Sequence, residues 1–400
     1  MADSGKLKEQ PLTGLKVIDL TRLLPGPLCT MMLGDYGAEV LKIEDIHAGD
    51  PTRFVGTFFE NGSAFFRQLN RNKKSIALDL KSVSGREIIK ILSKKADVLV
   101  EGFRPGVMDR LQLGYDHLKA INPQIVYASI SGYGQKGPYR DRAGHDINYT
   151  ALAGMLELSR GNDGNPVMPT VQIADIAGGS LMALNGIMMA LFKRETRGEG
   201  SFVDISMTRG LLPWLTYAAS ALTGNEALPR RDSAHITGGY ACYNIYKTKD
   251  NRFMSLGALE PAFWQNFCEA VSKPEWISLQ FEQEKREELI RQVRSLFKEK
   301  SRQEWIELFS ETDACCEPIL ELNEAIRHPV NRAEGYWLES AAGLEGELLT
   351  GFPLLFTGKT GSLRLQPPAH GEHTAEILEE LGYTKSDIET LRAQGVIKVK

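Results

Sequence analysis

From residue 15 onward the chain alternates short apolar runs, rich in β-branched residues, with amphipathic stretches, and this alternation constrains the fold more than any other feature. Such a pattern is typical of βαβ units, in which helices join parallel strands. The predicted strands are KVIDL (16–20), AEVLKIE (38–44), SIALDL (75–80), VLVEGF (98–103), IVYASISGYG (125–134, ending in a glycine loop) and FVDISM (202–207). The sequence therefore predicts an α/β fold built on a parallel sheet.

The predicted helices follow the strands. Pro25 and Pro27 suit the start of a helix that Gly37 ends, and a second helix is expected from about Ser84 to Lys95. The segment GGSLMALNGIMMALF (178–192) is apolar on most faces and too short for a bilayer. We therefore expect it to lie in the core.

The pattern changes after residue 225. Two alternating runs flank Lys249-Asp250-Asn251, which predicts a β-hairpin, and charged helices follow. We expect three parts: a large domain over 1–225, a small α+β domain over 226–328, and a return segment over 329–400 whose two C-terminal helices pack on the large domain.

Composition excludes several classes of partner. With 47 basic and 51 acidic residues the net charge is −4, so no overall field favours nucleic acid or an anionic membrane. No apolar stretch approaches the ~20 residues of a membrane span, and the start, MADSGKLKEQ, lacks the apolar core of a secretion signal. Five cysteines without metal-type spacing favour a reducing compartment. We expect a cytoplasmic protein.

Common phosphate-loop, hydrolase and metal motifs are absent from the sequence. The densest positive charge is the run Arg71-Asn72-Lys73-Lys74, with Arg104 and Arg110 around the loop after VLVEGF. These side chains can grip phosphates through charge-assisted hydrogen bonds, but a basic run is more often a solvated surface.

A second group of polar residues follows the glycine loop. AGHDINY (143–149) holds His145, Asp146 and Tyr149, and QIADIAGG places Asp175 just ahead of the apolar helix. A histidine can act as acid or base near neutral pH, and a neighbouring carboxylate can set its charge. Taken singly, such a histidine is more often structural and such an aspartate is often an ordinary helix cap.

Several segments together resemble the family III CoA-transferases, the CaiB/BaiF type, and in particular their racemase branch. They are GLKVIDLTRLLPGPLCTMMLGDYGAEVLKIE, RNKKSIALDLK, LVEGFRPGVMDRLQLG, SGYGQKGPYRDRAGHDINY and ADIAGGSLMALNGIMMAL, with GALEPAFW, ETDACCEPIL and GEHTAEILEELGY near the end. The resemblance implies a Rossmann-like large domain, a small α+β domain and an interlocked homodimer.

For the reaction, the resemblance implies epimerisation of the α-carbon of 2-methylacyl-CoA thioesters, with His145 and Asp175 as the two proton-transfer groups. Glu260 resembles the glutamate that orients the family's histidine, from the partner subunit. Asp146 would support the pair. Gly178 and Gly179 would offer backbone N–H groups at a helix start to the enolate, where one such donor typically contributes ~3 kcal/mol. Metal and redox cofactors are not expected.

The resemblance also implies a binding site for coenzyme A, which is part of the substrate. Its expected contacts are Arg71, Asn72, Lys73, Arg104, Arg110, Tyr133 and Tyr149. The transferase branch remains an alternative, with Asp175 as a nucleophile that forms an acyl anhydride, and a CoA-binding protein without chemistry is a third. An apolar wall of Leu, Met and Phe would accept many acyl groups, so the sequence leaves that group open.

Overall fold

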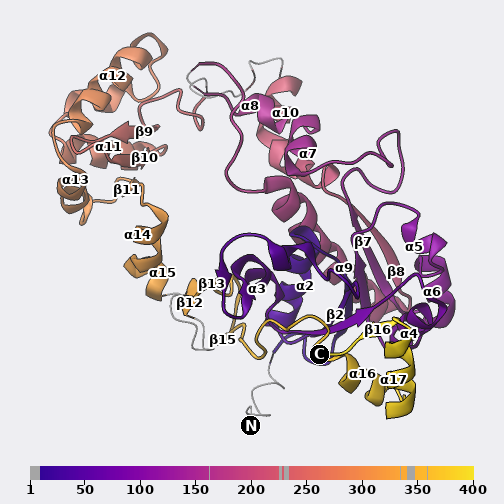
Figure 1. Cartoon of the computed structure of the whole chain (residues 1–400). Helices are drawn as coiled ribbons and strands as arrows, with labels where there is room; N and C mark the ends of the chain where they lie inside the picture. The colour runs from indigo at the N-terminus through magenta and orange to yellow at the C-terminus, as the bar shows by residue number, and fades with distance from the viewer. Residues whose placement is uncertain are drawn as a thin grey trace. The chain divides into compact units, whose positions relative to one another are not determined.

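The computed structural model describes residues 10–161, 163–224, 228, 234–333, 335–339, 347–357 and 359–400. Its contacts divide the chain into two units (Figure 1). The first unit comprises 1–153, 169–213 and 332–400, and the second comprises 154–168 and 214–331.

A seven-stranded sheet forms the centre of the first unit. Its strands are β1 (Lys16–Leu20), β2 (Glu39–Glu44), β5 (Lys73–Leu78), β6 (Val98–Glu101), β7 (Val126–Ser131), β8 (Ser201–Ser206) and β16 (Ile397–Lys398). They lie in the order β16-β5-β2-β1-β6-β7-β8, and only β16 runs antiparallel to its neighbour. The predicted parallel α/β sheet is confirmed, in the strand order of doubly wound, Rossmann-type sheets.

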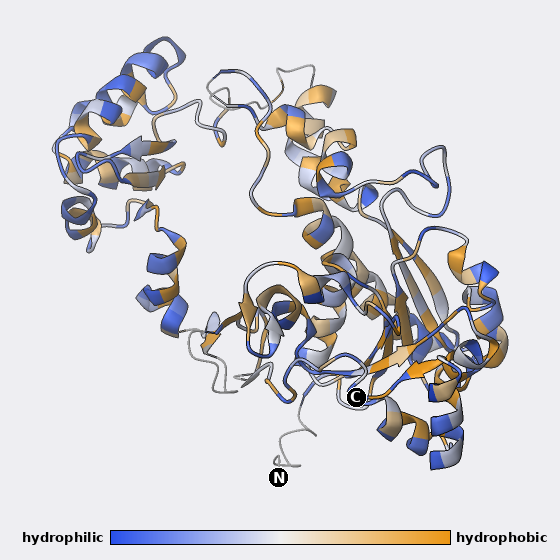
Figure 2. Ribbon diagram, viewed as in Figure 1, coloured by the Kyte–Doolittle hydropathy of each residue, from blue (hydrophilic) through white to orange (hydrophobic). Residues whose placement is uncertain are grey.

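Helices cover the sheet as the sequence pattern predicts. The main ones are α2 (Pro25–Asp35), α4 (Val83–Ser93), α6 (Tyr115–Ile121), α16 (Thr374–Glu380) and α17 (Lys385–Ala393). One core cluster joins the sheet to α4, α6, α16 and α17, with Leu99 and Ile88 among its fully buried members. Both α16 and α17 carry hydrophobic and hydrophilic residues (Figure 2), as one-sided packing requires.

The long apolar helix is less buried than expected. It begins at Ala174 as the π-helix η2 (Ala174–Leu181) and continues as α9 (Met182–Arg197), packing on α2, β7 and β8. By length and composition alone, Ala174–Arg197 would suffice to cross a membrane. Met189 and Phe192 are 72% and 73% exposed. The prediction of a core helix is therefore wrong for one face, which a single copy of this unit leaves uncovered.

The second unit contains a small antiparallel sheet. Strands β9 (Tyr243–Lys247) and β10 (Phe253–Gly257) form the predicted hairpin, and β11 (Cys316–Pro318) pairs with β10. The helices α11 (Pro261–Ala270), α12 (Arg286–Phe297) and α13 (Arg302–Phe309) surround a core of stacked aromatic rings that includes Trp264, Phe267 and Phe297.

The expected domain boundary at 225/226 lies outside the described residues. The observed division falls earlier, at Pro213/Trp214, and Gly154–Met168 also groups with the second unit. Sequence composition shifts after 225, but contacts decide the division, and the apolar helix α10 (Thr216–Thr223) groups with the second unit.

The remaining elements of the first unit are short: η1 (Pro51–Phe54), β3 (Phe58–Phe59), β4 (Gly62–Ser63), α3 (Ala64–Asn70), α5 (Val107–Arg110), α7 (Asp146–Leu152), η3 (Arg209–Leu215, which runs into the second unit), β12 (Trp337–Glu339), β13 (Leu348–Thr350), β14 (Leu355–Phe356) and β15 (Lys359–Thr360). Those of the second unit are α8 (Met155–Leu158), η4 (Pro274–Leu279), η5 (Gln283–Lys285) and α14 (Leu322–Arg327), while α15 (Pro329–Ala333) spans the boundary.

Candidate active site

The predicted catalytic residues of the first unit, His145 and Asp175, lie in the part of the chain that joins the carboxyl end of β7 to β8. From β1 the strands β2 and β5 are added toward one edge of the sheet, and from β6 the strands β7 and β8 are added toward the other edge. The loops that follow β1 and β6 therefore lead away in opposite directions. Open α/β sheets bind ligands at such a switch point. The loop 102–106 follows β6, and the glycine loop 132–137 follows β7.

Tyr149 holds the glycine loop to the start of α7. Its hydroxyl donates to the carbonyl oxygen of Gly144 at 2.5 Å, and its ring meets that of Tyr133 edge-on at 5.2 Å. A Cβ on Gly132 would lie 2.5 Å from the Tyr149 ring. Only glycine fits there, so the ring and the loop fix each other's position.

The same short segment carries the candidate proton-transfer groups. His145 is exposed and precedes α7, and its backbone N–H donates to the Asn148 side chain at 3.0 Å. The next residue, Asp146, accepts a hydrogen bond from the backbone N–H of Asp175 at 3.0 Å. This bond joins the start of α7 to the start of η2, and it brings Asp175 into the electrostatic range of His145.

Asp175 has the charge properties of a proton-transfer group. Partial burial and the Asp146 carboxylate raise its pKa to about 6, while His145 acts in the opposite direction. A carboxyl group with this pKa exchanges its proton within reach of neutral pH. Burial and the charge of Asp175 also raise the pKa of Tyr149, to about 12, so its hydroxyl stays a neutral donor.

Asp175 lies inside the helix and not just ahead of it, because η2 begins at Ala174. Gly178 and Gly179 therefore lie four and five residues beyond the first residue of the helix, so the prediction that they form a helix start is wrong. Their contribution of N–H groups to the enolate stays a prediction. A Cβ on Gly178 would collide with the Met207 carbonyl, and one on Gly179 would approach Pro25 at 2.9 Å. Both glycines serve the close packing of η2.

The predicted basic residues separate into two groups. Arg104 and Arg110 are exposed, and Arg140, which the sequence analysis did not single out, joins them. A Cβ on Gly106 would lie 3.3 Å from Arg140 and 3.6 Å from Arg110. Within the described residues none of the three forms an ion pair. Arg104 also acts on the pKa of Tyr149, which places this positive group beside the aromatic pair.

Arg71, Asn72 and Lys73 are in the interior, which does not support their predicted contact with coenzyme A. Arg71 is 1% exposed and binds Asp35 at 2.7 Å, and Asn72 donates to the same carboxylate at 2.7 Å. Lys73 has no exposed surface and binds Asp19 at 3.0 Å. The physical reason is that β5 begins at Lys73, two residues earlier than predicted, so the run continues into the sheet.

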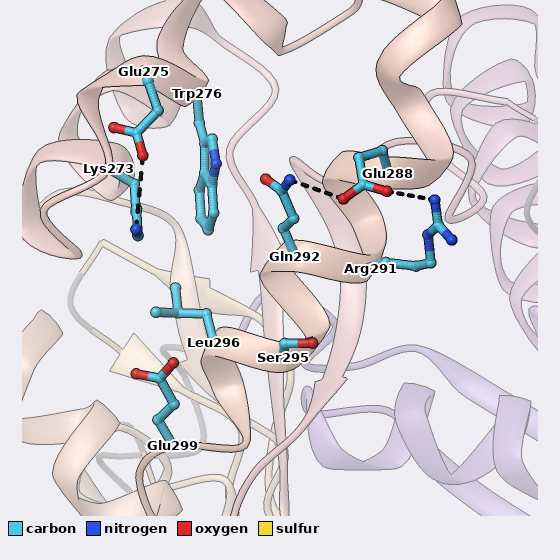
Figure 3. Close-up of a pocket in the computed structure, with 9 residues that line it drawn as sticks. All are labelled: Lys273, Glu275, Trp276, Glu288, Arg291, Gln292, Ser295, Leu296 and Glu299. Atoms are coloured by element: carbon cyan, nitrogen blue, oxygen red, sulfur yellow. Dashed lines mark hydrogen bonds and ion pairs between the residues drawn. The ribbon is translucent and has the colours of Figure 1, made fainter.

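Glu260 belongs to the second unit. It is exposed and directly precedes α11, whose first residue is Pro261, and its carbonyl accepts from the Trp264 N–H at 3.1 Å. A separate cavity of about 540 Å³ in this unit lies between η4 and α12 (Figure 3). It contains none of the predicted site residues. Its lining residues are Lys273, Glu275, Trp276, Glu288, Arg291, Gln292, Ser295, Leu296 and Glu299.

Sequence reasoning missed two residues near the strand ends. Arg140 lies in the loop before AGHDINY, but no local sequence signal indicates that it lies beside Gly106. Glu101 ends β6, is 5% exposed, and its pKa is raised to about 7 by burial. An acidic residue that closes an otherwise apolar strand was the available signal.

A sequence profile of CoA-transferase family III matches residues 12–374, so this chain belongs to that family. The family acts on acyl-CoA substrates, and the chain is an enzyme of this class. A CAIB/BAIF family protein from Brucella suis shares the fold with a TM-score of 0.81 and 28% identity, over 93% of this chain and 99% of that one.

Curated relatives from two branches are equally similar to this chain. Alpha-methylacyl-CoA racemase of Homo sapiens is 35% identical over 398 residues, which is 97% of each chain. Succinyl-CoA:glutarate CoA-transferase of Mus musculus is 36% identical over 399 residues, 97% of this chain and 91% of that one. Overall similarity thus leaves racemase and transferase open.

Proposed function

We propose that this enzyme epimerises the α-carbon of 2-methylacyl-CoA thioesters by proton transfer between the substrate and His145 and Asp175. The observation that carries the proposal is the pair itself, because an exposed histidine stands in electrostatic contact with a carboxyl group whose pKa is about 6. A carboxyl group with this pKa can hold or release its proton near neutral pH, and histidine is the side chain that most often serves as acid or base there.

In one direction neutral His145 takes the proton from C2, and the electron pair of that C–H bond moves into the thioester to give an enolate. Protonated Asp175 then delivers a proton to the opposite face of C2. The product has the inverted configuration, His145 is left protonated and Asp175 ionised. The opposite reaction starts from these states, with the roles exchanged. Proton transfer at a thioester-activated carbon requires no metal or redox cofactor.

The exposed arginines supply the binding site for the phosphates of coenzyme A. Arg110 and Arg140 lie beside Gly106, and Arg104 precedes this glycine by two residues in the same loop. None of the three has an ion-pair partner in the described part of the chain. Phosphate oxygens satisfy guanidinium groups through charge-assisted hydrogen bonds. Tyr133 and Tyr149 then lie between the phosphates and the His145–Asp175 pair.

The enzyme works as a homodimer of the interlocked type, in which Glu260 of one protomer orients His145 of the other. The uncovered apolar face of α9, with Met189 and Phe192, supports an interface between copies. Sedimentation should give about twice the 44.4 kDa mass of the chain, and a fully active monomer would contradict this proposal. Five cysteines without disulfides suit a cytoplasmic location.

The test is to incubate the protein with (S)-2-methylacyl-CoA in deuterated water and to follow configuration and deuterium at C2. We expect loss of optical activity with deuterium incorporation, and a decrease of at least about a hundredfold in His145→Ala and in Asp175→Ala.

The second candidate is a CoA-transferase in which the Asp175 carboxylate attacks the thioester carbonyl and the CoA thiolate leaves. The equally similar transferase relative favours it. In that case C2 stays undeuterated, added carboxylates become CoA thioesters in an Asp175-dependent manner, and hydroxylamine traps an acyl group on Asp175. This result would replace the racemase proposal.

A further inference from the structure

Glu101 is a buried carboxyl group that the proposed proton transfers do not use. It is the last residue of β6 and is 5% exposed. Burial raises its pKa to about 7, although hydrogen bonds from Ser129 and from the backbone of Phe103 oppose the shift, and Asp109 adds a like charge. Keeping an acidic group in this position costs free energy, which indicates that its contacts have a role.

The strand register places Glu101 in a polar row. Glu101 pairs with Ser129 on β7, and Ser129 pairs with Asp204 on β8. Directly paired residues of adjacent strands project from the same face of a sheet. Three polar side chains therefore stand side by side at the carboxyl ends of β6, β7 and β8.

Hydrogen bonds connect this row to two loops. The Phe103 N–H donates to Glu101 Oε2 at 2.7 Å. Gln135, in the glycine loop, donates from Nε2 to Ser129 Oγ at 2.8 Å and from its backbone N–H to Asp204 at 3.2 Å. Because the Ser129 oxygen accepts from Gln135, its single hydroxyl proton is free to donate to Glu101. Two hydrogen bonds and the side-by-side pairing of Glu101 with Ser129 thus form a chain of polar contacts from the loop after β6 to the loop after β7.

These two loops carry the groups that surround the proposed ligand. Arg104 follows Phe103 directly, and Tyr133 lies two residues before Gln135. We infer that Glu101 is a positioning residue of the acyl-CoA site, whose carboxyl group holds the Arg104 loop in register with the Tyr133 loop. This inference rests on the proposed binding of coenzyme A by these loops.

The experiment measures the affinity for coenzyme A itself by calorimetry, together with KM and kcat. Glu101→Ala removes the acceptor of the Phe103 N–H, and we expect the Kd and KM to rise about tenfold or more while kcat changes less, because misplaced loops weaken binding before they alter the chemistry. Glu101→Gln keeps an amide oxygen for that N–H and should restore most of the affinity.

Ser129→Ala and Gln135→Ala interrupt the same chain away from Glu101, and we expect smaller increases of Kd in both. They also provide the test if Glu101→Ala does not fold. Wild-type affinity in folded Glu101→Ala, or in both of these variants, would overturn the inference, as would a Glu101→Gln variant as weak as Glu101→Ala. If the wild-type protein itself does not bind coenzyme A, the proposed function fails instead.

Discussion

Two regions of the first unit treat charge in opposite ways. The strands β1, β2 and β5 carry buried charges that are paired with opposite charges. Lys73 on β5 binds Asp19 on β1, and Lys42 on β2 binds Asp50. In the segments that follow β6 and β7, like charges lie together: Arg110 and Arg140 beside Gly106, and Asp146 beside Asp175.

The comparison is sharpest for two aspartates. Burial alone raises the pKa of Asp19, but the ammonium groups of Lys73 and Lys42 bring it far below the usual range. Asp175 is also partly buried but faces another carboxylate, and its pKa rises to about 6. Paired charges serve the folded structure, whereas unpaired like charges are retained where a ligand or a reaction needs them.

The largest effect is expected in the paired region. Lys73→Met leaves the Asp19 carboxylate buried without its closest cation, and loss of one partner of a buried pair costs about 3–5 kcal/mol. Its neighbour Lys74 is the matched control, because its ion pair with Glu376 is exposed and contributes less than about 1 kcal/mol. Thermal and urea unfolding should separate the two variants, and equal losses would break the comparison.

The exposed arginines should show the reverse behaviour. Removing one charge-assisted hydrogen bond costs about 1.5–3 kcal/mol, so Arg104→Ala and Arg110→Ala should each raise the KM for acyl-CoA by roughly ten- to a hundredfold. The unfolding midpoint should not change, because neither side chain has an ion-pair partner among the described residues.

Arg392→Ala, at an exposed arginine of α17, is the control for this pair and should leave KM unchanged. Added salt should raise KM in the wild-type protein more than in Arg104→Ala, since exposed charges are screened. If Arg104→Ala lowers the stability of the protein but leaves KM normal, Arg104 stabilises the fold and does not bind the substrate.

The same contrast explains what the sequence could predict. Strands such as KVIDL and SIALDL are recognisable because burial on both faces demands a continuous apolar run. The burial of Arg71 and Lys73 could not be predicted from the neighbouring sequence. Their partners Asp35 and Asp19 lie 36 and 54 residues away in the chain. His145 and Asp175 are candidates by residue type and position, and the resemblance implies their roles. The hydrogen bond that joins their segments, however, runs from Asp175 to Asp146, 29 residues apart. Tertiary contacts, not local pattern, set these charges.

The smallest effect, and the most specific, is expected from Asp146→Asn. The amide oxygen can still accept the hydrogen bond from the Asp175 N–H, but the negative charge that raises the pKa of Asp175 is gone. In the direction in which Asp175 donates the proton, the rate falls as pH rises through that pKa. Since the substitution lowers the pKa, this fall should move to lower pH, by up to about one unit, or about 1.4 kcal/mol.

The measurement is the pH profile of kcat/KM, which reports groups of the free enzyme. Asn148→Ala removes the side-chain acceptor of the His145 N–H and leaves the charge of Asp146 in place, so it serves as a control for disturbance of the same helix start. If the two variants lower the rate equally at every pH, Asp146 only holds the backbone of η2. If only Asp146→Asn moves the fall of kcat/KM to lower pH, the proximity of the two carboxylates sets the pKa of Asp175. The unpaired charges of this region then act in the chemistry itself.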